Sequence, residues 1–388
     1  MRIKTYFLIF GLLAVFGVKK TAAQNPLNNF DLIGFHHIID QGDYYKVYLK
    51  VSLSSQYSPK ELTLFVDNDR SYSFMNDTVL QTQIENEFIF EFEKNKNEVK
   101  GNSIRLFVTD KLAKTLLEQE IHLPAKEDLK YPDFAILKEP SMTPLFHGYT
   151  NPDQQLRFLD SKQDESLYAF YYSKAFGHAK PPMVTDFLPE EAINVDKVIK
   201  YNSEQSFSLS DKGLYLFQKD TNSLVATSVL SKKNTFPELR SINDLIESFR
   251  YLLKGDEYSK LIESENPKTD FDALVLKLAP TKNAAKELIR NYFFRVKIAN
   301  LFFTTYKEGW KTDMGMIFII FGNPDVINKS KNQVTWTYFK LPGQRSTKFT
   351  FKRIESIFSK NHYVLERKKS FSETWFRLVS LWREGRIR

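Results

Sequence analysis

The chain has 388 residues, a formal charge of +8 and no cysteine. The length predicts roughly two to four domains rather than one hydrophobic core. The absence of cysteine excludes disulfide bonds, cysteine nucleophiles and cysteine-ligated zinc. Hydrophobic residues make up 42% of the chain, as in a globular protein, and the 34 Phe and 19 Tyr favour β-rich packing.

Residues 1–24 have the pattern of a signal peptide. Arg2 and Lys4 precede an apolar run from residue 6 to 18, and small residues follow at Thr21, Ala22 and Ala23. The run is short for a transmembrane anchor, which is the alternative. We expect a cleaved signal peptide, no lipoprotein processing, and an exported mature chain that is periplasmic or associated with the cell surface.

The positive charge is concentrated at the C-terminus. The formal charge falls from +8 to +4 when the four basic residues before position 24 are removed, and residues 340–388 hold 13 basic and four acidic residues. This basic segment could meet a lipid headgroup, an acidic glycan or an acidic protein, or it could be a solvated surface. Nucleic acid is not expected as a partner, because no nucleic-acid-binding motif is recognisable.

Residues 25–125 are predicted to form an immunoglobulin-like β-sandwich. Between Tyr45 and Leu53, apolar residues alternate with Lys46, Lys50 and Ser52, which predicts one buried face and one solvent-facing side. About seven such strands are expected in this region. A charged linker, 126–131, leads to residues 132–235, which we interpret as a second β-sandwich.

A helical segment is expected at residues 238–308. Apolar residues recur at helical spacing from Ile242, and Ser241 is a suitable N-cap. Breaks at Gly255 and Pro280 divide the segment, and the last helix is predicted from 282 to 306.

Residues 309–388 are expected to form a small antiparallel sheet with a C-terminal helix. The apolar run 316–321 is interpreted as a strand that ends at the turn formers of residues 322–325. Three further strands are expected at 333–339, 348–353 and 362–366. The predicted fold class is therefore α+β: two β-sandwiches, a helical segment and this last domain.

The C-terminal helix, from about residue 372, carries two tryptophans on one face, Trp375 and Trp382. One interpretation is that this face docks on the sheet. The alternative is an exposed partner-binding surface made of Trp375, Trp382, Arg377 and Arg383.

The C-terminal third of the chain resembles the GWxTD domain family. The resemblance is carried by Gly309, Trp310, Thr312, Asp313, Gly315, Gly322, Pro324 and Asp325. The upstream residues Tyr292, Arg295, Val296, Ala299 and Phe303 are similar to the helix that precedes the motif in the family, and Trp336 and Tyr338 to its tryptophan–aromatic strand.

The sequence departs from the family pattern at two positions. Members often have Arg where this chain has Met314, and Pro where it has Asn323. The resemblance implies an exported protein of Bacteroidota or related bacteria. It implies no catalytic residues, because the family has no established enzymatic activity.

Asp313 and Asp325 are the candidate catalytic carboxylates. They would flank a strand of about ten residues, some 33 Å when extended, which argues against a paired-carboxylate site. We interpret both as residues that bind the backbone N–H groups of their own turns. Trp310 is expected to fill the helix–sheet junction, Thr312 to serve as a turn or cap residue, and Arg295 to pair with Asp313.

No metal or cofactor site is expected. The six histidines lack the spacing of a helical zinc site, and the sequence contains no nucleophile elbow, P-loop or dinucleotide fingerprint. These histidines are His36, His37, His122, His147, His178 and His362.

The sequence favours a non-enzymatic exported protein that acts as a structural, binding or assembly module of the cell envelope, with an envelope protein as its partner. One alternative is a module that binds glycan or peptidoglycan. A second alternative is a hydrolase of envelope glycan or peptide that uses Asp313 or Asp325.

Overall fold

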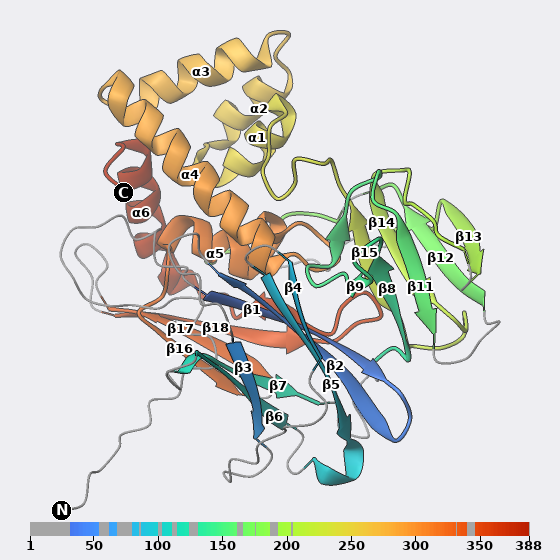
Figure 1. Cartoon of the computed structure of the whole chain (residues 1–388). Coiled ribbons are helices and arrows are strands. Elements are labelled where there is room, and N and C mark those ends of the chain that lie inside the picture. Colours follow the sequence, from blue (N-terminus) through green and yellow to red (C-terminus); the bar gives the residue numbers. More distant parts are fainter. Residues whose placement is uncertain are drawn as a thin grey trace, which may run out of the picture. The chain divides into compact units, whose positions relative to one another are not determined.

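The computed structural model is α+β, with mostly antiparallel sheets and six α-helices in its described part (Figure 1). The α+β class predicted from the sequence is thereby confirmed. The structure describes residues 32–53, 62–67, 80–84, 87–99, 103–110, 115–123, 131–160, 166–174, 176–186, 193–202, 205–330, 332–339 and 346–387. The expected signal peptide, nearly all of the charged linker, and Arg388 lie outside these residues.

The chain divides into two compact units. The first consists of residues 1–146 and 157–165, and the second of residues 147–156 and 166–388. The strands expected in the second β-sandwich are therefore shared between the units, and the boundaries given above for the two sandwiches stay predictions. No helix in the described ranges is both long and apolar enough to cross a membrane.

Three sheets fall in the first unit. The first has the order β1-β2-β5-β4, with β1 Leu32–Asp40, β2 Tyr44–Leu53, β5 Glu87–Asn95 and β4 Leu80–Ile84. The second has the order β3-β6-β7, with β3 Leu62–Asp67, β6 Ser103–Asp110 and β7 Thr115–His122. The third has the order β11-β8-β9, with β11 Leu156–Asp160, β8 Phe134–Lys138 and β9 Thr143–Pro144.

Strand β2 was predicted to have one buried and one solvent-facing side, and only the buried side is as predicted. Val47, Leu49 and Val51 belong to a core cluster that also contains residues of β5 and β6. The opposite face was expected to be solvated, but Tyr48 and Lys50 on it are buried. The reason is that Tyr48 packs in a second cluster with Ile39 of the neighbouring strand β1 and with Ala135 and Leu137 of β8, which belongs to another sheet.

The second unit begins with a five-stranded sheet. Its order is β10-β15-β14-β12-β13, with β10 Tyr149–Thr150, β15 Thr227–Ser231, β14 Gly213–Gln218, β12 Ser166–Tyr172 and β13 Lys197–Asn202. Four helices follow, namely α1 Ile242–Phe249, α2 Gly255–Ile262, α3 Pro267–Leu278 and α4 Lys282–Phe303. Ser241 accepts a hydrogen bond from the Asp244 N–H, so the expected N-cap is confirmed.

The unit ends with α5 Asp313–Phe321, a sheet and α6 Ser372–Arg383. The sheet has the order β16-β17-β18-β19, with β16 Val326–Ser330, β17 Gln333–Tyr338, β18 Thr347–Ile354 and β19 His362–Leu365. The expected helices and the last three expected strands are present.

The prediction of a strand at residues 316–321 was wrong, because this run lies in α5. Every residue from Asp313 to Phe321 is buried, so the helix is apolar on all sides and shows no amphipathic period. A short continuous apolar run is compatible with a buried strand or a buried helix, and periodicity cannot separate them. The first strand of the sheet is instead β16, which was not predicted because three of its five residues are polar and give only a weak strand pattern.

The tryptophans of α6 lie in the core. Trp375 and Trp382 are 3% and 0% exposed, and the Trp382 indole N–H donates to the Ile320 carbonyl oxygen at 3.0 Å. Arg383 is bound to Glu257 by two hydrogen bonds of 2.7 and 2.8 Å. The burial expected of this face is therefore observed, but its partners are helices rather than the sheet: the Trp375 ring lies 6.3 Å from that of Phe321 in α5, and the Trp382 ring 5.6 Å from that of Tyr292 in α4. The alternative of an exposed tryptophan surface with Arg383 was wrong, and only Arg377 of that set is exposed.

We predict that Trp382→Ala destabilises this domain by about 3–5 kcal/mol, because it leaves a cavity in the core. The control is Phe376→Ala on the same helix, where the side chain is 62% exposed; it should change stability by less than about 0.5 kcal/mol. Urea unfolding followed by circular dichroism measures both. Equal losses for the two variants would contradict the placement of α6.

Candidate functional site

The GWxTD motif forms the connection between α4 and α5. A short 3-10 helix, Gly309–Lys311, lies directly against α4. A Cβ atom at Gly309 would overlap the carbonyl oxygen of Ala299, and one at Gly315 would overlap the carbonyl oxygen of Gly309. Both glycines are therefore required by the close approach of two backbones.

Side chains of α4 and of the motif bind the backbone of this connection. The Asn300 amide oxygen accepts from the Trp310 N–H at 3.1 Å, and its NH₂ group donates to the Pro237 carbonyl oxygen at 3.0 Å. The Thr312 hydroxyl accepts from the Gly315 N–H at 3.0 Å and donates to the Gly309 carbonyl oxygen at 2.7 Å. Thr312 is thus the N-cap of α5, as expected for a turn or cap residue.

Trp310 is buried, with 3% of its surface exposed, and its ring lies 6.3 Å from that of Tyr251. Its expected place at a helix–sheet junction stays a prediction. The Tyr251 hydroxyl donates to the Trp310 carbonyl oxygen at 2.9 Å. Burial raises the pKa of the Tyr251 hydroxyl, and the charge of Asp313 adds to this effect. Tyr251 therefore stays protonated and keeps its role as donor.

Asp313 forms a buried ion pair with Arg367. Their side chains are 8% and 7% exposed, and the guanidinium binds both carboxylate oxygens. The Leu365 N–H donates to the same carboxylate at 2.8 Å. The expected pair between Arg295 and Asp313 was wrong, and so was the expectation that Asp313 binds its own turn.

Arg295 binds the opposite end of α5. Its guanidinium donates to the carbonyl oxygens of Ile319 and Ile320 at 3.0 and 3.3 Å, and stacks on the Trp382 ring at 4.8 Å. Burial lowers the pKa of Arg295 to about 10, so the side chain remains charged at neutral pH. A cation at the last carbonyls of a helix is favourable, because these groups have no partner within the helix.

Asp325 lies beyond the C-terminal end of α5, whereas Asp313 lies at its N-terminus. The nine residues of α5 span about 13 Å. The carboxylate of Asp325 accepts from the Phe339 N–H at 2.6 Å and so fixes the end of β17. The expectation that Asp325 binds its own turn was wrong, because its partner Phe339 is 14 positions away. The helix keeps the two carboxylates apart although the expected strand does not exist.

Sequence reasoning missed Glu308, which precedes the motif. It is 6% exposed and forms ion pairs with Lys232 and, at 3.1 Å, with Lys311. Burial raises its pKa, but the attraction of the two lysines outweighs burial and lowers the pKa to about 2. The only feature of the sequence that could have indicated a role for Glu308 is its position directly before Gly309.

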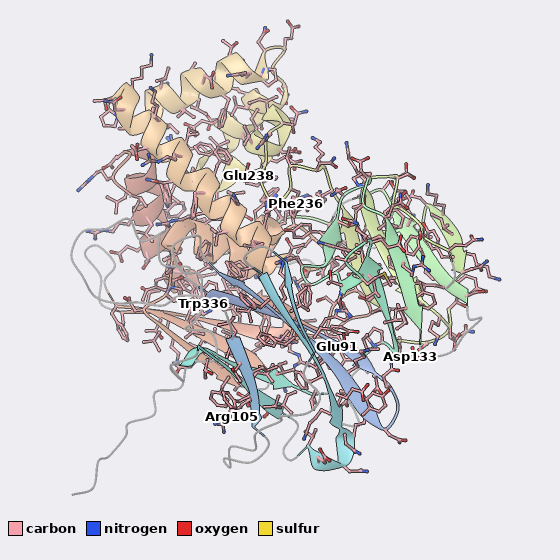
Figure 2. All side chains as sticks on the ribbon, viewed as in Figure 1. Glu91, Arg105, Asp133, Phe236, Glu238 and Trp336 are labelled. Carbon is pink, nitrogen blue, oxygen red and sulfur yellow. The ribbon has the colours of Figure 1, made fainter. Side chains whose placement is uncertain are left out.

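A cavity of about 160 Å³ adjoins the motif. Its lining includes Glu308, Trp310, Lys232, Phe236 and Glu238, of which the last two are labelled in Figure 2. This volume is below the range of about 300–1,000 Å³ that is typical of ligand pockets. No group of three His, Asp or Glu side chains in the described residues could hold a metal ion.

Comparison with known proteins identifies the domain. Residues 213–384 match the model of the GWxTD domain family, so the chain carries a GWxTD domain, and the resemblance noted in the sequence is confirmed. The matched span starts at the first residue of β14 and ends at residue 384, directly after α6. No curated protein matches the chain.

Among solved structures, the chain is similar to an I-band fragment of titin, with 13% identity and a TM-score of 0.17. It is also similar to a mutated variant of the corresponding titin domains, with 12% identity and a TM-score of 0.17. Each match covers 52% of this chain and 65% of the titin chain, so the chain spans less than two thirds of these structures. Similarity at this level carries no argument about function.

We predict that Glu308 stabilises the protein above about pH 5 and that this contribution disappears toward pH 2. The folded-state pKa of about 2 lies below the ordinary value of 4.5, so the stabilisation is present above the unfolded pKa and is lost as pH falls through the folded pKa. It is on the order of 3 kcal/mol.

Unfolding in urea at several pH values, for wild type and Glu308→Gln, measures this effect. The difference in unfolding free energy should shrink as the pH falls. Glu247→Gln, which removes an exposed carboxylate of α1, controls for the loss of one negative charge. A difference that stays constant down to pH 2 would contradict the assignment.

Proposed function

We propose that the protein is a non-enzymatic exported module of the bacterial cell envelope that binds a protein partner. In this proposal residues 1–24 direct export to the periplasm or cell surface, and residues 25–125 and 132–235 act as immunoglobulin-like binding modules. The GWxTD domain is the rigid part of the assembly, as the family resemblance to exported proteins of Bacteroidota suggests.

The observation that carries the proposal is the environment of Asp313. Both oxygens of the carboxylate are bound by Arg367, and one also accepts from the Leu365 N–H. A general base needs a free lone pair within reach of a substrate proton. Asp313 would have to break a buried ion pair first, so the hydrolase alternative gains no support from this residue.

A surface for the partner is offered by β13. This strand is an edge of the five-stranded sheet, and Val195 and Val198 on or next to it are 43% and 55% exposed. Edge strands present unpaired backbone N–H and C=O groups, and extended segments of other proteins add to them. By contrast, the edge strand β16 exposes only polar side chains, at Asn328, Lys329 and Ser330.

We predict that a photo-crosslinking amino acid at position 198 captures one protein partner in intact cells. Leu276 on α3 is the matched control, because it is also about half exposed, at 51%, but lies on a helix. Mass spectrometry should identify the same partner in replicate experiments from position 198 and not from position 276.

Absence of a reproducible crosslink from position 198 would contradict the proposed partner surface. A pull-down of the purified protein on cell wall then tests the glycan-binding alternative. Retention on cell wall without any protein crosslink would replace the assembly proposal with that alternative.

A further inference from the structure

The cavity of about 160 Å³ beside the GWxTD motif is lined by segments that are distant in the sequence. Lys212 comes from the position directly before β14, Glu247 from α1, and Trp310 from the motif itself. Phe236, labelled in Figure 2, comes from the stretch between β15 and α1. All of these residues belong to the second unit, so one compact part of the chain brings them to a common space.

Five of the seven charged side chains in the lining are bound by a side chain of opposite charge. They form the pairs Lys232–Glu308, Lys233–Asp244 and Lys297–Glu238, of which Lys297 lies outside the lining. The other two, the Lys212 ammonium and the Glu247 carboxylate, have no hydrogen-bond or ion-pair partner among the described residues. The cavity therefore offers one positive and one negative charge to a ligand.

The lining also has an apolar part and an unused donor. Phe236, Leu239 and Trp310 supply apolar surface. Trp310 is only 3% exposed, yet its indole N–H has no hydrogen-bond partner in the described part of the chain. An indole N–H in a buried side chain usually has an acceptor. A ligand with an acceptor oxygen would supply one.

These features restrict the class of ligand. A purely anionic ligand would meet the carboxylate of Glu247, and a purely cationic one would meet the ammonium of Lys212, so each would face a like charge in the same small space. A ligand that carries both charges avoids this repulsion. The volume corresponds to about five water molecules at roughly 30 Å³ each, which suits a small molecule and excludes one the size of a nucleotide.

We propose that this cavity binds a single free α-amino acid with an apolar side chain. Such a molecule carries a carboxylate and an ammonium group on one carbon atom. Lys212 and the Trp310 indole N–H donate to its carboxylate, and Glu247 accepts from its ammonium group. Phe236 and Leu239 contact its side chain.

Isothermal titration calorimetry of the mature protein with leucine and two blocked forms tests each charge of the ligand. N-acetyl-leucine lacks the ammonium group, and leucinamide lacks the carboxylate. Leucine should bind, and each blocked form should bind more weakly by about tenfold or more, because it loses a charge-assisted hydrogen bond.

Two variants assign the charges of the ligand to the residues of the cavity. Lys212→Gln should weaken leucine binding by about tenfold or more and leave leucinamide within about twofold, because leucinamide has no carboxylate to lose a partner. Glu247→Gln should weaken leucine binding equally and leave N-acetyl-leucine within about twofold. Circular dichroism confirms that each variant is folded.

Matched controls remove the same charges from exposed positions outside the cavity lining. They are Lys277→Gln on α3 and Glu265→Gln between α2 and α3, and both should leave leucine binding within about twofold of wild type. In proton–nitrogen NMR spectra, the indole signal of Trp310 should shift with leucine and not with leucinamide, because only leucine brings the carboxylate.

The apolar wall is tested with phenylalanine and aspartate, of which the first should bind and the second should bind at least about tenfold more weakly than leucine. The proposal is overturned if neither leucine nor phenylalanine binds at about 10 mM, a concentration that detects a millimolar Kd. It is also overturned if N-acetyl-leucine binds as tightly as leucine, or if the control variants weaken leucine binding as much as Lys212→Gln and Glu247→Gln.

Discussion

The buried carboxylate of Asp313 is the constraint on which the GWxTD domain depends. A carboxylate that is removed from water must be matched by a cation and by hydrogen-bond donors, or the charged form becomes costly. Arg367 and the Leu365 N–H meet this requirement, and both lie at the end of β19. One side chain thereby ties the N-terminus of α5 to the sheet, and through Arg367 to the loop around Lys180.

The other contacts of the motif follow from the same placement. Because α5 is buried on all sides, its two ends must find polar partners within the protein. Thr312 caps the first turn and Arg295 binds the last carbonyls, while Gly309 lets the chain pass close to α4. The residues of the motif thus enclose a helix and supply polar partners to its two ends.

The local structure of this domain could be predicted from the sequence. Helix caps and apolar periods predicted α1 to α4, and turn formers with alternating residues predicted β17 and β18. Features that depend on contacts between distant residues could not be predicted from the sequence. The apolar run of α5 has no period that separates a helix from a strand, and the partner of Asp313 is 54 positions away, among many other arginines. For the same reason Arg295 was expected to bind Asp313, whereas it binds the other end of α5. Nothing in the sequence indicated that Tyr251 and Asn300 bind the backbone of the motif.

A double-mutant cycle of Asp313→Asn and Arg367→Met tests most directly whether the motif aspartate is structural. All four tryptophans lie between residues 310 and 382, so fluorescence in urea reports the unfolding of this domain. Each single variant should cost about 3–5 kcal/mol, because it leaves one buried charge unmatched, and the double variant should cost clearly less than the two losses added together. An Asp313→Asn variant as stable as wild type would contradict the account.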